Sequence, residues 1–262
     1  MKKKLLNIVL LALLALPALA QSVPNIGAIS STQAHNVVWE TKIFRQIEFL
    51  SDSLCGGRAT GTRGSTEAAA WIMRRFSSIG LMPCGDAWTH HFYEPFGRNV
   101  IGFLPGSSKR HRDSYVIVMS HYDGLGTLNG VLYPGADSNA SGTASRKGNA
   151  SGVVSMISIA EMFSSMRHLG RAYGSNLIFV ALDAKSGSMK GSRALWKMIS
   201  EGLLQDPVSG KAIEPSQIGM VVNIDQVGGT MSTLKSGRKD FIIMLGREAA
   251  GRISQDSSAS AT

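Results

Sequence analysis

Three side chains that could bind a metal ion follow one short apolar run. The run Tyr115–Met119 is typical of a buried strand, His121 and Asp123 come directly after it, and Asp137 lies further along. Imidazole and carboxylate groups are usual ligands of catalytic zinc, and the His-x-Asp spacing lets the carboxylate orient the ring. The alternative is a hydrogen-bonded histidine at a strand end and an ordinary turn aspartate. Taken alone, the three residues favour this alternative, so the choice between a metal site and ordinary structural roles depends on the rest of the sequence.

Two more predicted strands end in polar side chains. The strand 176–182 is followed by the segment Asp183–Ser186, and the strand 218–224 is followed by Asp225. Open α/β sheets bind their ligands beyond the carboxyl ends of their strands. We therefore expect both segments to lie beside His121, which favours a functional site over a chance placement.

The order of the predicted elements indicates the fold class. Apolar residues at helical spacing predict four helices, and short apolar or alternating runs predict the strands between them. The helices are 37–51, 65–79, 152–166 and 192–201; the remaining strands are 89–93 and 98–104, a hairpin at the sheet edge, and 241–245. This alternation predicts an α/β fold, with a mostly parallel, doubly wound sheet flanked by helices.

The N-terminus has the pattern of a cleaved signal peptide. Residues 1–4 are basic, residues 5–16 are apolar, and the Ala18-Leu19-Ala20 triplet is a small-x-small cleavage signal. We therefore expect a signal peptide over 1–20 and a periplasmic or secreted product. The apolar core is too short for a membrane span, and no later run is long enough. One domain is expected over 21–250, followed by a disordered tail over 251–262.

Charge and cysteine content narrow the function classes. The chain has 27 Lys and Arg against 18 Asp and Glu, and without the three lysines of the leader the excess falls from +9 to +6. The densest basic cluster, 109–112, lies in a Gly/Ser-flanked loop without aromatics, which favours a solvated turn over a nucleic-acid site. Cys55 and Cys84 would reach an oxidising compartment, where a disulfide and two buried thiols both remain open.

Two glycine-rich segments do not predict nucleotide binding. The segment 55–64 lacks the Lys-Ser/Thr ending of a phosphate-binding loop, and no helix is predicted directly after the segment 124–130. No cofactor-binding residues are therefore assigned.

Several motifs together resemble the bacterial co-catalytic zinc aminopeptidases, a family that also includes glutaminyl cyclases and glutamate carboxypeptidases. The resemblance covers about residues 49–245 and is carried by GRATGTRG, SHYD, PGADSNASG, FVALDA with GSMKGS, and NIDQVG. It implies a single zinc-aminopeptidase-like domain with two zinc ions that share a bridging aspartate. His121 would be a zinc ligand, Asp123 its orienting partner and Asp225 the terminal carboxylate of the same zinc. The implied ligands are peptides.

This sequence departs from the family where the resemblance implies a glutamate pair. The positions of the general base and of a zinc-ligating glutamate are occupied by Lys185 and Ser186. An ammonium there places positive charge where the metals need negative charge. We therefore expect zinc to bind weakly or not at all, and no residue is assigned as catalytic.

The bridging aspartate is also displaced. The family spacing, Asp-x-x-Ser-Gly, puts Ser138 in that place, and a shift of one residue would bring in Asp137. The Asn-Ala-Ser-Gly motif then recurs at 149–152, where Gly148 precedes it. The family's last histidine ligand would lie in a C-terminal segment that this chain is expected to lack, which makes the domain C-terminally incomplete. At most His121, Asp137 and Asp225 would hold one metal ion.

Three functional hypotheses follow. The first is an exported protein of this fold that is catalytically impaired and retains a peptide-binding cleft. The second is an active zinc aminopeptidase that cleaves N-terminal residues and recruits Asp183 and Asp137 as carboxylates; glutaminyl-cyclase activity is a variant of it. The third is a non-enzymatic binding protein or a fragment. None of them predicts nucleic-acid binding, and the sequence sets no oligomeric state.

Overall fold

The computed structural model describes residues 31–93, 96–135, 148–171 and 173–227. The chain divides into two units, Met1–Arg45 and Gln46–Thr262. Helix α2 (Ser31–Ser51) begins in the first unit and ends in the second. All further elements described below belong to the second unit, which contains the sheet.

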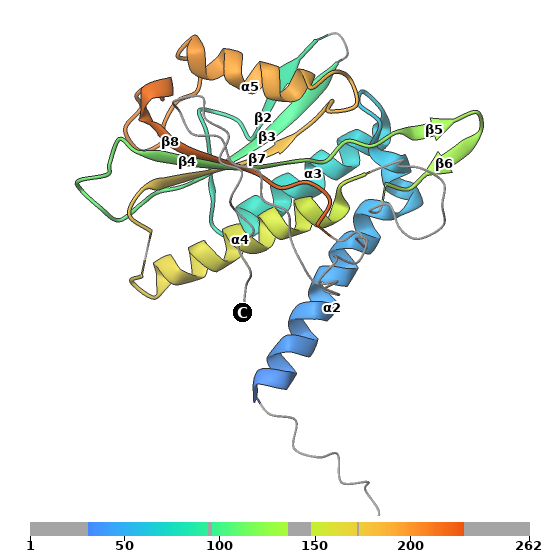
Figure 1. The fold of residues 1–262 in the computed structure, drawn as a ribbon, viewed down its shortest axis with the longest axis horizontal. Coiled ribbons are helices and arrows are strands. Elements are labelled where there is room, and N and C mark those ends of the chain that lie inside the picture. Colours follow the sequence, from blue (N-terminus) through green and yellow to red (C-terminus); the bar gives the residue numbers. More distant parts are fainter. Residues whose placement is uncertain (1–30, 94–95, 136–147, 172, 228–262) are drawn as a thin grey trace, which may run out of the picture. The chain divides into compact units, whose positions relative to one another are not determined.

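The central sheet has six strands in the described part of the chain (Figure 1). They are β1 (Met82–Pro83), β2 (Thr89–Phe92), β3 (Gly97–Leu104), β4 (Tyr115–His121), β7 (Asn176–Leu182) and β8 (Ile218–Asn223). Their order is β1-β3-β7-β4-β8, with β2 also paired to β3. The pairs of β4 with β7 and β8 are parallel, whereas β3 runs antiparallel to β7, β1 and β2.

The α/β class, with a central sheet flanked by helices, is confirmed, but the sheet is mixed. Parallel strands need a crossover connection of about a dozen residues or more, and only residues 105–114 join β3 to β4, which lie on either side of β7. Strand β3 therefore enters the sheet in the opposite direction. The predicted pairing of β2 with β3 is correct, yet β3 lies inside the sheet because β7 pairs with its other side.

Helices cover both faces of the sheet. Helices α3 (Arg63–Ser78) and α4 (Ala150–His168) lie on one face, and α5 (Lys190–Ser200) lies on the other (Figure 1). Each begins two residues before its predicted start. Thr62 caps α3, because its hydroxyl accepts a hydrogen bond from Ser65 N at 3.3 Å.

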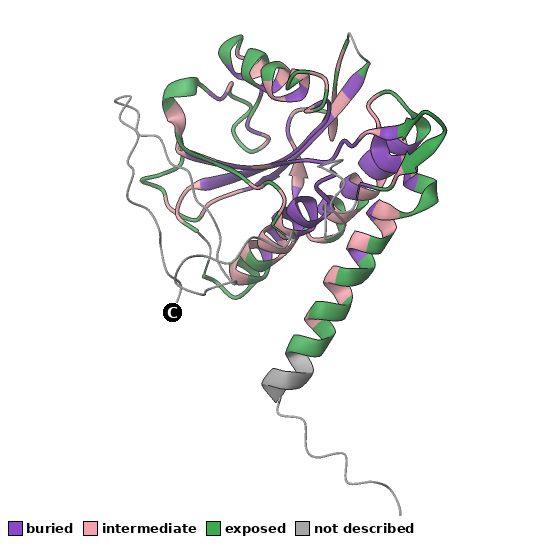
Figure 2. Ribbon diagram, turned by 45° about the vertical axis from the view of Figure 1, so that its right-hand side comes forward, coloured by how far each residue is buried: buried purple, intermediate pink, exposed green. Residues whose placement is uncertain are grey.

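The core lies between the sheet and these helices. All seven residues of β7 are buried, as its continuous apolar run predicts. Side chains of β3 and β7 pack with Leu195 and Ile199 of α5 in one apolar cluster. Figure 2 shows this burial concentrated along the strands and on the inner sides of the helices.

The remaining described elements are short, and some predicted segments lie outside the described residues. The segment after β4 forms a small hairpin, β5 (Gly126–Leu128) with β6 (Val131–Tyr133), and two short 3-10 helices span Ser53–Arg58 and Pro215–Gln217. The predicted leader 1–20, the strand 241–245 and the tail 251–262 lie outside the described residues.

Both cysteines are buried free thiols. Burial, with a smaller contribution from Asp206, raises the pKa of Cys84 to about 12, so this thiol stays protonated at neutral pH.

None of the helices among the described residues combines the length and apolar character that a membrane span requires.

Candidate functional site

The strand register brings three chain segments together at the carboxyl end of the sheet. In β4 and β7, His121 is paired with Leu182, so the residues after Leu182 emerge beside His121. In β4 and β8, Met119 is paired with Asn223, and two residues further along each strand His121 meets Asp225. The structure thus brings His121, Asp123, Lys185 and Asp225 into one cluster.

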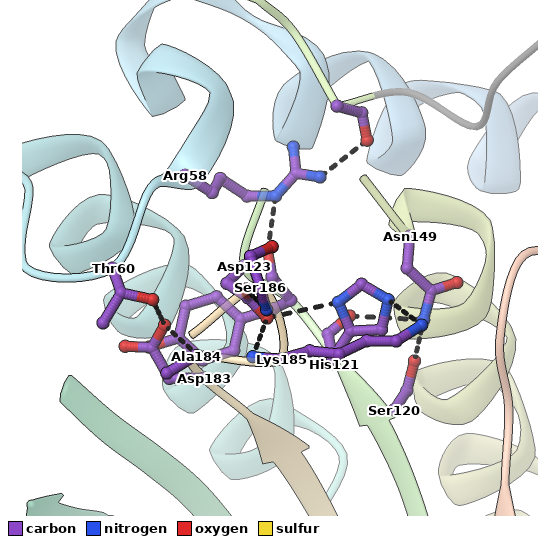
Figure 3. A network of polar contacts seen from close by, with 12 residues as sticks. Arg58, Thr60, Ser120, His121, Asp123, Asn149, Asp183, Ala184, Lys185 and Ser186 are labelled. Atoms are coloured by element: carbon purple, nitrogen blue, oxygen red, sulfur yellow. Dashed lines mark hydrogen bonds and ion pairs between the residues drawn. The ribbon is translucent and has the colours of Figure 1, made fainter. Parts of the chain in front are cut away.

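Asp123 is a buried anion that holds the histidine ring. Its side chain is fully buried, and His121 Nδ1 donates to its Oδ1 at 3.2 Å (Figure 3). The backbone amides of Lys185 and Ser186 each donate to the carboxylate at 3.0 Å. Burial alone would raise the pKa of Asp123, but these hydrogen bonds outweigh it and hold the pKa below its usual value. The ring is therefore fixed with Nε2 facing Asp225 and Lys185.

Lys185 places its ammonium group at the ring's other nitrogen. Lys185 Nζ donates to Asp225 Oδ2 in a short ion pair and approaches His121 Nε2 at 3.3 Å. His121 Nε2 also lies 3.2 Å from Asp225 Oδ1. Burial would raise the pKa of Asp225, but the hydrogen bond and charge of Lys185, with His121, hold it below its usual value. The ammonium contacts both groups that would ligate a metal ion.

The donor set among the described residues does not fit a co-catalytic zinc pair. A catalytic zinc needs three protein ligands, and two metals need a bridging carboxylate besides. Here His121 and Asp225 offer one nitrogen and one carboxylate, and the cation of Lys185 contacts both. No cluster of three metal-ligating His, Cys, Asp or Glu side chains occurs in the described part. Asp137, the remaining predicted ligand, lies outside it.

The second Asn-Ala-Ser-Gly motif opens helix α4. Asn149 caps the helix, and its Oδ1 accepts from Gly152 N at 3.1 Å and from Gln226 N at 2.7 Å. Its Nδ2 donates to Ser120 Oγ at 2.9 Å and to Ile224 O at 3.0 Å. Asn149 therefore ties the ends of β4 and β8 to α4. Sequence reasoning missed this role, although an Asn before a helical apolar pattern is a cap signal.

The residue before this motif has no room for a side chain. A Cβ on Gly148 would lie 1.8 Å from the backbone oxygen of Gly135 and 2.4 Å from Arg58 Nη2. Real Cβ atoms do not approach other atoms so closely, so an aspartate would not fit here without moving the backbone. Gly148 stands where the resemblance would put the bridging aspartate before the motif that begins α4, and this position has no space for an aspartate side chain.

Arg58 is a second residue that sequence reasoning missed. Its side chain is fully buried and donates to Tyr122 O and Gly135 O, both at 2.6 Å, to Pro134 O at 3.1 Å, and to Leu50 O. Through these hydrogen bonds, Arg58 connects the residue after β4 to the segment just before Asp137. An arginine within a glycine-rich loop gives no sequence signal for such burial.

Asp183 points away from the cluster. It is 1% exposed, and its Oδ1 accepts from Thr60 Oγ1 at 2.7 Å and from Ala184 N at 2.8 Å (Figure 3). Its Oδ2 accepts from Tyr122 OH at 3.0 Å, Arg98 N at 3.2 Å and Ser65 Oγ at 3.4 Å. Burial raises the pKa of Asp183, although the hydrogen bond from Thr60 opposes this. Its carboxylate anchors the glycine-rich loop to the sheet instead of facing His121.

Replacing Asp183 by alanine is expected to lower the free energy of unfolding by about 3 kcal/mol, because buried hydroxyl and amide donors lose their acceptor. Urea unfolding followed by circular dichroism measures this. Ser186→Ala is the matched control at the same strand end, with an exposed side chain, and should change stability by less than about 0.5 kcal/mol. Equal effects of the two substitutions would contradict the anchoring role.

One family model and several solved structures are similar to parts of this chain. Residues 99–146 match the model of peptidase family M28. The LapA aminopeptidase of Legionella pneumophila aligns at 15% identity and a TM-score of 0.50, over 76% of this chain and 47% of that chain. A leucine aminopeptidase precursor from Bacteroides thetaiotaomicron aligns at 16% identity and a TM-score of 0.44, over 73% and 62%. The glutaminyl cyclase of the same species aligns at 16% and 0.44, over 73% and 61%.

The match to the family model supports the resemblance stated from the motifs. At 15% identity the likeness to LapA shows the fold. This chain spans about half the length of LapA and about three fifths of the Bacteroides enzymes. No curated protein matches the sequence.

Proposed function

Given this chain's similarity to peptidase family M28, we propose that it is an exported peptide-binding protein with the zinc-aminopeptidase fold and impaired peptidase activity. The observation that carries the proposal is the ammonium of Lys185, which contacts His121 Nε2 and Asp225 at the edge where the resemblance implies zinc. The signal-peptide pattern of residues 1–20 supports export to the periplasm or the medium.

The missing groups account for the impairment. Hydrolysis by a zinc pair needs metals that polarise the scissile carbonyl and a base that takes a proton from the attacking water. Lys185 stands where the resemblance implies the base, and a protonated amine accepts no proton. Loss of a general base alone lowers the rate by roughly 10²–10⁴-fold. Loss of metal ligands removes the carbonyl polarisation as well.

Peptide binding is the function that this edge can retain. The carboxyl edge of an α/β sheet is where such folds bind ligands, and it keeps exposed polar groups in Asp225, Lys185 and Ser186. A peptide has both an amino and a carboxyl group to pair with them. The fold contributes this position without requiring the hydrolytic step.

The M28 match also supports a second candidate, an active zinc-dependent aminopeptidase. That candidate requires Asp137 to enter the site and Lys185 to leave His121 and Asp225. Asp183 is not available to it, because five donors already hold that carboxylate. A glutaminyl-cyclase activity would need the same rearrangement.

A metal count and an activity assay separate the two candidates. We expect the purified chain to carry less than one equivalent of zinc by elemental analysis after brief dialysis, and to show no chelator-sensitive hydrolysis of an aminoacyl anilide. The matched control is His121→Ala, which should leave both values unchanged because the wild-type edge does not use the ring to bind zinc. Two tightly bound zinc ions per chain, or turnover that His121→Ala abolishes, would establish the active enzyme instead.

A further inference from the structure

The end of the sheet opposite the site carries a cluster of basic side chains on two loops. One loop joins β3 to β4 and contains Lys109, Arg110 and Arg112; the other joins α4 to β7 and contains Arg171, and Arg167 lies just before it in the last turn of α4. We call these five residues the basic end. All five are exposed, and Asp113 is the single acidic residue on the described parts of the two loops.

Backbone hydrogen bonds hold the two loops side by side. Ser107 N donates to Tyr173 O at 2.9 Å, and Ser108 N donates to Gly174 O at 3.2 Å. Arg167 Nη1 donates to Pro105 O at 2.6 Å, and Asn176 Nδ2 donates to Arg112 O at 2.6 Å. The two loops thus lie side by side at the same end of the sheet (Figure 1).

Neutralisation of the helix dipole explains only part of this surface. Arg167 lies in the last turn of α4, where a cation interacts favourably with the helix C-terminus. Lys109, Arg110 and Arg112 belong to no helix, and they form no ion pair with any described residue. No carboxylate of the described residues therefore neutralises these three cations.

Exposed apolar side chains lie among these cations. Leu169 is 75% exposed and Tyr173 is 45% exposed, on the same loop as Arg171. The ring of Tyr173 packs edge-on against Phe163 with ring centroids 5.6 Å apart, which fixes its position. A leucine and a tyrosine at the level of several basic residues suit a membrane interface, where apolar groups enter the headgroup region and cations meet lipid phosphates.

From this charge and this apolar content, we propose that the basic end docks on an anionic phospholipid surface. The partner class follows from complementarity: a planar array of phosphates matches cations spread over two loops, and an acyl boundary matches Leu169. A nucleic acid would also attract the cations, but it offers nothing for an exposed leucine. The inference does not depend on the peptide site at the other end of the sheet.

Vesicle sedimentation tests the proposal with the full chain. We expect binding to phosphatidylcholine–phosphatidylglycerol vesicles, weaker binding to pure phosphatidylcholine vesicles, and weaker binding at higher salt. Each basic residue near an anionic membrane strengthens binding by about fivefold, so the triple variant Lys109→Ser, Arg110→Ser and Arg112→Ser should bind roughly a hundredfold more weakly. Leu169→Ser should weaken the binding that remains at high salt.

A matched variant controls for net charge. Arg63→Ser, Lys190→Ser and Arg193→Ser remove three cations from the first turns of α3 and α5, near the carboxyl edge of the sheet, and should retain binding within about fivefold. All variants keep the same N-terminal segment, so its contribution to vesicle binding is common to them. Equal losses in both triple variants, or no preference for phosphatidylglycerol, would overturn the proposal. So would tight oligonucleotide binding that needs the basic end and exceeds the vesicle binding.

Discussion

Replacing Lys185 and Ser186 together by glutamate is expected to strengthen zinc binding by about a thousandfold relative to the wild-type chain. Removing one positive charge about 4 Å from a cation is worth about 4 kcal/mol at an effective dielectric constant near 20. The substitutions also supply carboxylates beside His121 Nε2 and Asp225, where the ammonium lies in the wild-type chain. Isothermal titration calorimetry with zinc measures the affinity directly.

Two single changes separate charge removal from ligand gain. Lys185→Met removes the ammonium without adding a donor, so its gain in affinity measures the charge effect alone, and any larger gain in the double variant measures the added carboxylates. Lys190→Glu changes charge at the start of α5 and serves as a control outside the cluster. If the double glutamate variant binds zinc no better than wild type, the ammonium is not what keeps the metal out. We expect no matching gain in peptidase turnover, because Gly148 leaves the bridging position of the α4 motif closed.

Replacing Arg58 by methionine is expected to lower the free energy of unfolding by about 3–5 kcal/mol. Methionine keeps much of the apolar stem, but the buried carbonyls of Leu50, Tyr122 and Gly135 and the partly buried carbonyl of Pro134 lose their donor. A buried acceptor left unpaired costs about 1–3 kcal/mol, so the loss of several such hydrogen bonds accounts for this range. Urea unfolding measures the difference.

A second arginine of the same segment controls for the loss of charge. The side chain of Arg63 is 86% exposed and pairs with Glu67 at the surface, so Arg63→Met should cost less than about 0.5 kcal/mol. Arg58→Lys keeps the charge but loses the planar fork, and its stability should fall between methionine and wild type. A cost for Arg58→Met as small as for Arg63→Met would show that the carbonyls find other partners.

The amino-acid sequence by itself determined the strands that meet at the site. The run 176–182 is apolar without interruption, so it predicted β7 to the residue, and the polar groups after β4, β7 and β8 predicted one shared edge. The sequence also indicated that Lys185 and Ser186 occupy the positions where the resemblance implies two glutamates, because these residues closely follow the predicted strand 176–182. Local patterns suffice where hydrophobic burial decides the structure.

Only the tertiary structure decided what the side chains at that edge do. The two Asn-Ala-Ser-Gly motifs are identical in sequence, and contacts of Asn149 with Ser120, Ile224 and Gln226 show that the second one opens α4. Asp183 and Lys185 are two residues apart, yet one turns to Thr60 and the other to Asp225. Such choices depend on hydrogen-bond partners distant in the chain, and these partners become neighbours only when the strands and helices have packed.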